Sequence, residues 1–208
     1  MDYTEYGWQS PDVHTQSYLF PIVKRIIDEL NLIQDILILD AGCGGGALVN
    51  HLHKLGFKNT YGFDASLTGI AIAQKSFPEI SNHFFIHNCY EKYLPIHHQF
   101  KLIISMDVIE HFYSPIRYLE NIYHWLDHNG YLILTTPYHG YLKNLLIIFL
   151  NKFDKHFNPL DEGGHIKFFT KNKLYSLLQR TGFKPLKLYG SGRLPYLWKS
   201  MVIIAQKM

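Results

Sequence analysis

Residues 36–47 decide the fold of this chain, and they read Ile36-Leu37-Ile38-Leu39-Asp40-Ala41-Gly42-Cys43-Gly44-Gly45-Gly46-Ala47. Four apolar residues lead into an acidic residue, a glycine-rich turn follows, and an amphipathic run continues to Leu55. This order predicts a strand, a tight turn and a helix, which is how a nucleotide-binding β-α-β unit begins. The glycines let the backbone approach a ligand closely, and the helix N-terminus behind them offers unpaired N–H groups.

The glycine turn alone is compatible with more than one ligand. Gly42-x-Gly44-x-x-Ala47 also fits the fingerprint of dinucleotide-binding proteins. Asp40 favours a different ligand, because a carboxylate beside the turn would repel a pyrophosphate and attract a cationic group. S-adenosylmethionine carries an ammonium and a sulfonium and has no phosphate. A turn that only packs the strand on the helix is the remaining interpretation.

Length and composition indicate a single globular domain spanning residues 1–208. Apolar residues make up 47% and charged residues 18% of the chain. The formal charge of +3 comes without a long basic run, so we expect no nucleic-acid partner. Cys43 and Cys89 do not form a disulfide framework or a metal pattern, which is typical of a reducing compartment. The acidic first residues lack the apolar core of a secretory signal, so we expect a cytoplasmic protein.

The rest of the chain alternates between strands and helices. Apolar patterning predicts helices over 18–32, 47–55, 67–77, 114–126, 138–152 and 170–180, and strands over 36–39, 60–64, 83–87, 100–106, 131–136, 183–190 and 197–205. Ser66, Ser114 and Thr170 are the expected helix caps. We therefore predict an α/β fold with a Rossmann-like, mostly parallel, seven-stranded sheet, helices on both faces and a C-terminal antiparallel hairpin.

Two segments lie outside this alternation. Residues 1–17 are polar and aromatic, and they are either a loose arm or a lid over the ligand. Residues 138–169 are the expected acceptor-side insertion, and their helix 138–152 is apolar nearly all round. That helix is either a buried lid over the acceptor pocket or, through residues 141–153, an interfacial helix that contacts a membrane peripherally. Residues 154–164 are expected to form a polar loop.

Several motifs together resemble the class I S-adenosylmethionine-dependent methyltransferases. They are Leu39 to Gly46, Gly62-Phe63-Asp64, Met106 to His111, Leu132 to Tyr138 and Thr181-Gly182-Phe183. The Glu110-His111 pair and Thr135-Thr136-Pro137 are similar to the small-molecule O-methyltransferase branch that includes ubiquinone-biosynthesis enzymes. The resemblance implies that S-adenosylmethionine is the cofactor and S-adenosylhomocysteine (SAH) the product.

The resemblance also implies roles for individual residues. Asp40 would lie close to the methionine amino group, and Asp64, which is 20 positions after Gly44, would accept hydrogen bonds from both ribose hydroxyls. Asn88 could contact adenine or be a plain turn residue. The full set of implied cofactor-binding residues is Asp40, Gly42, Cys43, Gly44, Gly46, Asp64, Ala65, Asn88, Cys89, Met106 and Asp107.

Methyl transfer to an oxygen requires alignment and a general base, because the sulfonium already makes the methyl group electrophilic. Histidine is the usual base near neutral pH. His111, His139 and His165 are on the predicted ligand side, and His111 and His165 are the preferred catalytic candidates. Each of the three could instead have a purely structural role. No pattern of metal ligands is evident, so no metal site is predicted.

The predicted function is therefore transfer of a methyl group to a small-molecule acceptor, most simply to a hydroxyl oxygen. A hydrophobic acceptor is one option. The alternatives are a non-catalytic S-adenosylmethionine-binding protein, an N-methyltransferase or a nucleic-acid methyltransferase. An NAD-linked oxidoreductase is disfavoured because no Tyr-x-x-x-Lys pair occurs in the chain. The sequence leaves the acceptor and the oligomeric state open.

Overall fold

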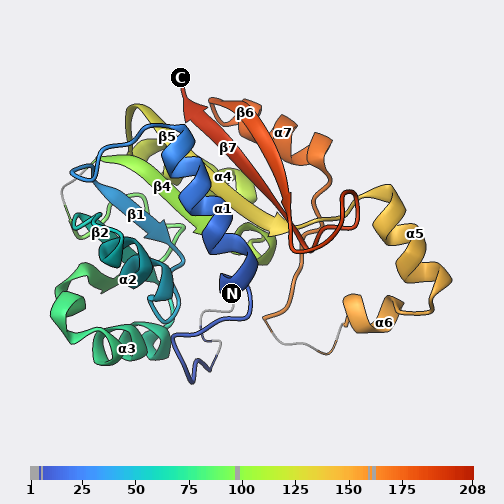
Figure 1. Cartoon of the computed structure of the whole chain (residues 1–208), viewed down its shortest axis with the longest axis horizontal. Coiled ribbons are helices and arrows are strands. Elements are labelled where there is room, and N and C mark those ends of the chain that lie inside the picture. The colour runs from blue at the N-terminus through green and yellow to red at the C-terminus, as the bar shows by residue number, and fades with distance from the viewer. Residues whose placement is uncertain (1–4, 6, 97–98, 159, 161–162) are drawn as a thin grey trace.

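The computed structural model describes residues 5, 7–96, 99–158, 160 and 163–208. Its centre is a seven-stranded sheet in the order β3-β2-β1-β4-β5-β7-β6 (Figure 1). The five neighbours from β3 to β5 pair in parallel, whereas β7 pairs antiparallel with both β5 and β6. The strands are β1 (Ile38–Ala41), β2 (Thr60–Asp64), β3 (Phe84–Ile86), β4 (Phe100–Met106), β5 (Leu126–Pro137), β6 (Phe183–Ser191) and β7 (Ser200–Lys207). This is the predicted fold class, including the C-terminal antiparallel hairpin.

Strand β4 shows why the central strands are nearly continuous apolar runs. Leu102, Ile103 and Ile104 are all fully buried, because helices cover both faces of the sheet. Leu102 and Ile104 face a cluster that contains α1 and α2 side chains, and Ile103 faces the cluster that contains α4 and α7 side chains. The alternation of side chains along a strand therefore divides one apolar run between two cores.

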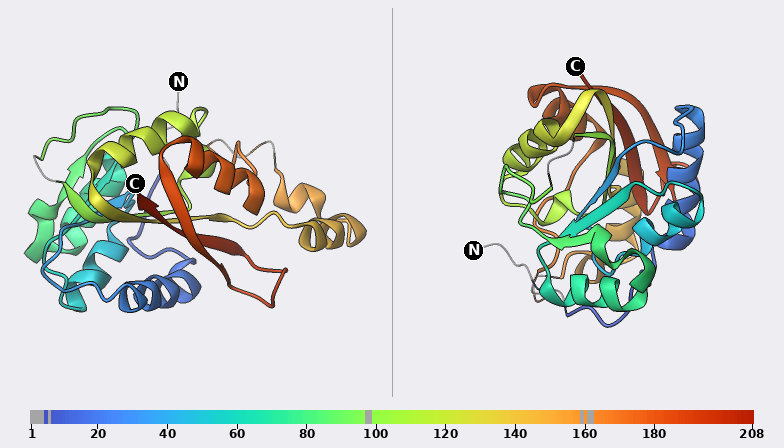
Figure 2. Two further views of the ribbon diagram at one scale, coloured as in Figure 1. Left: turned by 90° about the horizontal axis from the view of Figure 1, so that it is seen from above. Right: turned by 90° about the vertical axis from the view of Figure 1, so that its left-hand side faces the viewer.

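Helices α1, α2 and α3 lie on one side of the sheet, and α4 and α7 lie on the other (Figure 2). The α-helices are α1 (Gln16–Glu29), α2 (Ala47–Lys54), α3 (Leu67–Ser76), α4 (Pro115–Trp125), α5 (Tyr141–Phe149), α6 (Phe153–His156) and α7 (Lys171–Arg180), with short 3-10 turns η1 (Pro78–His83) and η2 (Ile109–His111). This arrangement leaves the carboxyl ends of the parallel strands open at one edge, which is where such sheets bind ligands.

Two of the three predicted helix caps are confirmed. Ser66 Oγ accepts a hydrogen bond from Gly69 N at 2.9 Å, and Thr170 Oγ1 accepts one from Lys173 N at 3.4 Å. Ser114 occupies the predicted cap position and Pro115 begins the helix, but the Ser114 side chain makes no cap hydrogen bond. The fifth strand also begins earlier than predicted. It starts at Leu126 and includes Asn129 and Gly130.

The region after β5 differs most from expectation. The predicted helix 138–152 is shorter, and α6 occupies part of the predicted polar loop. Both helices project away from the sheet (Figure 1). Only Lys143 and Ile147 of α5 are buried, while Phe149 is 82% exposed, so α5 is not a buried lid. Among the described residues, no helix is long and apolar enough to cross a bilayer.

Candidate functional site

A cavity of about 840 Å³ opens at the carboxyl ends of β1 and β4. Four parts of the chain line it: the N-terminal arm with the start of α1, the glycine turn, the end of β4, and the segments that follow β5 and β6. Of the predicted site residues, those lining the cavity are Asp40, Gly42, Cys43, Gly44, Met106, Asp107, His111 and His165. The structure therefore brings together the two halves of the predicted site, although they are far apart in the sequence.

Glycines are required in the turn after β1. Gly42 has φ +86°, and a Cβ there would lie 2.6 Å from Val108 Cγ2. Gly46 has φ +80°, but a Cβ there would collide with Phe84 and Ala73 of the core. The missing side chain at Gly42 therefore lets the turn pack against Val108, and the missing side chain at Gly46 lets it pack against Phe84 and Ala73. Gly42 lines the cavity and Gly46 does not, so the implied contact of Gly46 with the cofactor stays a prediction.

Asp40 is the buried acid at one end of the cavity. We call this the donor end, and the glycine turn and the end of β4 form it. Its side chain is 2% exposed. Burial, with a smaller contribution from the nearby Asp64 carboxylate, raises the pKa of Asp40 to about 8. A cationic ligand group beside this carboxylate would favour its ionised form, so the site is electrostatically incomplete without a cation.

Asp64 is the last residue of β2 and lies at the same edge of the sheet as Asp40. Its Oδ2 accepts a hydrogen bond from Gly44 N at 2.8 Å, and its Oδ1 accepts one from Ser66 N at 2.9 Å. Burial raises the pKa of Asp64, and the backbone hydrogen bonds oppose that rise. Asp64 and Ala65 are adjacent to the turn but do not line the cavity, so the expected ribose contact stays a prediction.

The predicted adenine contacts lie further away. Asn88 Oδ1 accepts a hydrogen bond from Tyr90 N at 2.9 Å, which is the geometry of a turn residue. Cys89 is 5% exposed within the core cluster, and its carbonyl accepts a hydrogen bond from Asn121 Nδ2 at 2.8 Å. The cavity does not reach either residue.

The described part of the N-terminal arm covers the glycine turn. The Trp8 ring packs directly on Gly44, because a Cβ on that residue would lie only 2.5 Å from the ring. The same ring also contacts Gly69. Glu5 accepts one hydrogen bond from Ser66 Oγ at 2.8 Å and another from the Thr68 hydroxyl. Sequence reasoning placed an arm or lid here but did not identify Trp8 as the residue that meets the turn.

Asp107 occupies an unusual backbone position at the end of β4. It has φ +53°, which is uncommon for a residue with a side chain. Thr135 Oγ1 donates to Asp107 Oδ1 at 2.7 Å and accepts from Asp107 N at 2.9 Å. Burial raises the pKa of Asp107, and this threonine hydrogen bond opposes the rise. The neighbouring strand β5 thus holds Asp107 at the cavity wall beside Met106.

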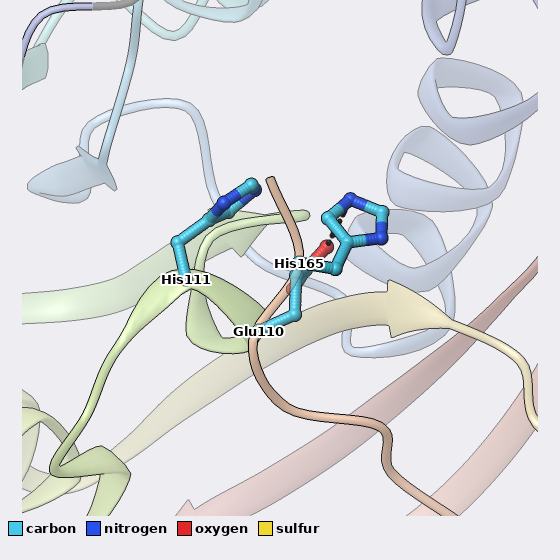
Figure 3. A group of neighbouring side chains, drawn as sticks. All are labelled: Glu110, His111 and His165. Carbon is cyan, nitrogen blue, oxygen red and sulfur yellow. Dashed lines mark ion pairs between the residues drawn. The ribbon is translucent and has the colours of Figure 1, made fainter. Parts of the chain in front are cut away.

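Glu110, His111 and His165 form a cluster (Figure 3), and its two histidines line the cavity. One potential ligand atom from each residue lies within 4.8 Å of those of the other two. His165 Nε2 is 3.9 Å from Glu110 Oε1, and the two imidazole centroids are 5.0 Å apart. The cluster joins residues that are more than 50 positions apart, which no local pattern could reveal.

Backbone hydrogen bonds bring these segments together. The carbonyl of Glu110 accepts hydrogen bonds from Ile166 N at 3.0 Å and Lys167 N at 2.9 Å. His111 Nδ1 lies 2.9 Å from the carbonyl oxygen of Gly163. A carbonyl oxygen can only accept, so His111 Nδ1 carries the hydrogen, and Nε2 is the basic atom of the neutral ring.

Burial controls the protonation of this cluster. Glu110 is 1% exposed, and desolvation, followed by the Asp107 charge, raises its pKa well above the ordinary value. Thr136 Oγ1 donates to Glu110 Oε2 at 3.0 Å, whereas Oε1 has no hydrogen-bond partner among the described residues. Burial lowers the pKa of His111, which favours the neutral form of its ring. The three side chains can transfer a proton or hold a divalent cation, although the sequence predicted no metal site.

The other end of the cavity is basic and aromatic. His139 packs against Phe168 and Phe157, with ring centroids 5.1 and 5.7 Å away. Desolvation lowers the pKa of His139 to about 4, so it is neutral near pH 7. The cations that line this end are Lys143, Lys155, Arg193 and Lys199. Sequence reasoning missed Arg193 and Lys199, because they lie in the β6–β7 connection, far along the chain from the predicted insertion.

The geometry and the sequence agree with one family. The profile of the family described as "Methyltransferase domain" matches residues 13–188. This match covers most of the chain, so the protein belongs to the methyltransferase-domain family. The match begins within the arm, includes the glycine turn and the Glu110 cluster, and ends in β6.

Curated relatives extend this similarity. The chain is 30% identical over 166 residues to a ubiquinone biosynthesis O-methyltransferase of Ruegeria sp. (strain TM1040), covering 78% of this chain and 66% of the relative. It is 27% identical over 171 residues to the Rickettsia bellii (strain OSU 85-389) protein of the same name, covering 81% and 70%. The chain thus spans about two thirds of the length of these relatives.

Solved structures share the fold. A magnesium protoporphyrin IX methyltransferase from Synechocystis PCC 6803 with bound SAH superposes with a TM-score of 0.68 at 21% identity, covering 94% of this chain and 84% of that one. The [4+2]-cyclase SpnF superposes with a TM-score of 0.69 at 14% identity, covering 100% and 87%. Because such different reactions share the fold, the acceptor must be inferred from the site.

Proposed function

We propose that this protein transfers the methyl group of S-adenosylmethionine to an oxygen of a small-molecule acceptor. The observation that supports this most directly is the single cavity that joins the glycine turn and Asp40 to His111 and His165. Membership of the methyltransferase-domain family supports the donor. The relatives named ubiquinone biosynthesis O-methyltransferase support an oxygen acceptor.

In this proposal the donor lies over the ends of β1 and β4. Asp40 pairs with the ammonium of the methionine moiety, and Gly42 allows that moiety to approach the backbone. Met106 and Asp107 flank the sulfonium, and the ribose lies toward Asp64. The protein mainly supplies alignment and exclusion of water, because the donor is already activated.

His111 removes the acceptor proton in this mechanism. Its Nδ1 is held by the Gly163 carbonyl, so Nε2 can accept a proton from a hydroxyl group. The second histidine, His165, lies beside His111, with Nε2 3.9 Å from Oε1 of the buried Glu110 carboxyl group. The methyl group moves from sulfur to oxygen, the C–S electron pair stays with sulfur, and the acceptor proton moves to His111.

The donor half is tested by calorimetry of the intact protein. We expect SAH to bind and NADH not to bind. Binding of NADH in place of SAH would overturn the proposal. Transfer of label from methyl-labelled S-adenosylmethionine to a phenolic probe such as 3,4-dihydroxybenzoate then tests turnover. SAH binding without transfer to any hydroxyl probe would indicate a binding protein or another acceptor atom.

The base is tested by replacing His111 and His165 together with Gln. We expect the double variant to bind SAH normally and to lose at least about 100-fold in rate. An unchanged rate and pH profile would remove both histidines from the chemistry. Chelation of the wild-type protein is the companion test, since activity lost to a chelator and restored by Mg²⁺ or Zn²⁺ would assign the cluster to coordination.

We also propose a peripheral membrane contact through α5 and α6. Ile148 is 64%, Phe149 82% and Phe153 51% exposed, so an apolar surface faces outward. Lys152 and Lys155 flank it and suit anionic headgroups. The two helices project from the body, so they can reach a bilayer without displacing the sheet (Figure 1).

Liposome flotation tests this contact. The wild-type protein is expected to float with vesicles that contain an anionic phospholipid, and a variant with Ile148, Phe149 and Phe153 changed to Ser is expected to remain in solution. A matched variant that changes the exposed Leu67 to Ser should float normally, since it lies on α3. Equal flotation of all three proteins would exclude the proposed contact.

A further inference from the structure

We infer that the acceptor carries an oxyanion, either a carboxylate or a phosphate, which binds to Lys143 and Arg193 at the basic end of the cavity. This inference rests on the proposed function, because it takes that end of the cavity as the place of the acceptor. It adds a chemical class that neither the fold nor the names of the relatives supply.

Lys143 is the first observation behind this inference. It comes from the first turn of α5, it is 8% exposed, and it lines the cavity. Its Nζ donates to the carbonyl oxygens of Tyr138 at 2.8 Å and Lys199 at 3.3 Å. These carbonyls orient the ammonium but do not neutralise its charge. Burial of a lysine without a countercharge is costly, so an anion bound beside Lys143 would stabilise it.

The surroundings of Lys143 are the second observation. Within the described ranges, no Asp or Glu side chain lies within 4 Å of the charged group of Lys143 or Arg193. Arg193 is close enough for its charge to add to the desolvation that lowers the pKa of Lys143 to about 8. Two cations that repel each other would both be stabilised by one anion between them.

The distribution of acids in the cavity is the third observation. Among the residues that the structure describes, the acidic ones that line the cavity are Asp40 and Asp107, and both belong to the donor end. Lys155, His156 and Lys199 line the opposite end together with Lys143 and Arg193. An acceptor with an anionic group would therefore orient itself, with the anion at Lys143 and the rest of the molecule toward His111.

A matched pair of probes tests this inference. Calorimetry of the protein–SAH complex with 3,4-dihydroxybenzoate and with its neutral amide compares two ligands that differ in one charge. We expect the carboxylate to bind about tenfold more tightly, and Lys143→Met or Arg193→Gln to remove that difference. Phenyl phosphate compared with benzoate separates the two oxyanions, since tighter binding of the phosphate assigns that group.

The control is Lys152→Met, which removes an exposed lysine of the same region that does not line the cavity. It should retain the preference for the anion. Equal binding of the carboxylate and the amide by the wild-type complex, or no binding of either, would overturn the inference. A weakened SAH affinity in Lys143→Met would also overturn it, because the lysine would then serve the donor carboxylate.

This design separates the inference from the proposed function. Failure of the protein to bind SAH or to transfer a methyl group to any probe counts against the proposed function. The preference for an anion is measured by binding and does not need turnover. A preference that persists without methyl transfer would show an anion site in a protein of different activity.

Discussion

The two ends of the cavity carry opposite kinds of ionisable side chain. Asp40 and Asp107 line the donor end, whereas Lys143, Arg193 and Lys199 line the other. A donor with an ammonium and a sulfonium is favoured at the first end and disfavoured at the second, and an anionic acceptor has the opposite preference. The contrast teaches that one cavity can place two ligands, because each ligand is attracted to its own end and repelled from the other.

The ends also differ in how they are built. The donor end consists of turns that directly follow buried strands, so the rigid sheet fixes Asp40 and Gly42. The acceptor end is assembled from segments that meet only in the folded chain, such as the Glu110 carbonyl with Ile166 N. We therefore expect substitutions at the donor end to have large and simple effects, and those at the acceptor end to separate binding from rate.

The largest effect is expected from Asp40→Asn, which breaks the charge contrast at the donor end. Removal of the only carboxylate proposed to meet the donor ammonium should weaken SAH binding by at least about 100-fold, the size expected when one partner of a buried charge pair is removed. Calorimetry measures it, with the exposed Asp35→Asn as the matched control. An unchanged affinity would place the ammonium elsewhere.

The same variant has a distinct effect on stability. The pKa of Asp40 is raised to about 8 in the folded protein and is about 4 in an unfolded chain. Between these values the folded protein holds a proton that the unfolded chain has lost, so this group lowers stability as pH rises from about 4 to 8. Asp40→Asn should therefore raise the melting temperature of the ligand-free protein more at pH 8 than at pH 5. A lowered melting temperature at pH 8 would show that the carboxylate stabilises the empty site.

The donor end was predictable from sequence because its signals are local. The predicted bounds of β2 and β4 are those of the structure, and the glycine turn lies where Ile36 to Ala47 placed it. Each of these elements is decided by apolar runs and turn residues within a few positions of one another. The roles of Asp64 and Asn88 were less predictable, since both side chains bond to nearby backbone in the structure.

The acceptor end was not predictable because its contacts are distant in sequence. His111 and His165 were proposed separately, but nothing local indicates that the Gly163 carbonyl fixes the His111 tautomer. The apolar composition of α5 was also ambiguous, because a buried helix and an outward-facing helix can have the same residues. Only the folded chain distinguishes them, with Phe149 exposed and Lys143 buried.

An effect confined to the rate is expected from replacing the two histidines one at a time. His111→Gln should lower kcat by about 100-fold, whereas His165→Gln, whose side chain is 41% exposed, should lower it by about tenfold. Burial lowers the pKa of His111, so the wild-type rate should rise with pH below its ordinary value and then level off. The measurement is kcat for 3,4-dihydroxybenzoate at saturating donor. Loss of that pH limb in His165→Gln alone would reverse the assignment.

The smallest effect is expected from Trp8, which sharpens the contrast by testing a residue that touches only the donor end. Its ring packs on Gly44 and Gly69, so Trp8→Ala should weaken SAH binding by about fivefold through lost apolar contact. The same variant should leave the affinity for 3,4-dihydroxybenzoate unchanged. SAH should also shift the tryptophan fluorescence of the wild-type protein, and Trp8→Phe should abolish that shift while Trp125 and Trp198 remain. A shift that survives in Trp8→Phe would show that the arm does not respond to the donor, and the donor end would then consist of the sheet edge alone.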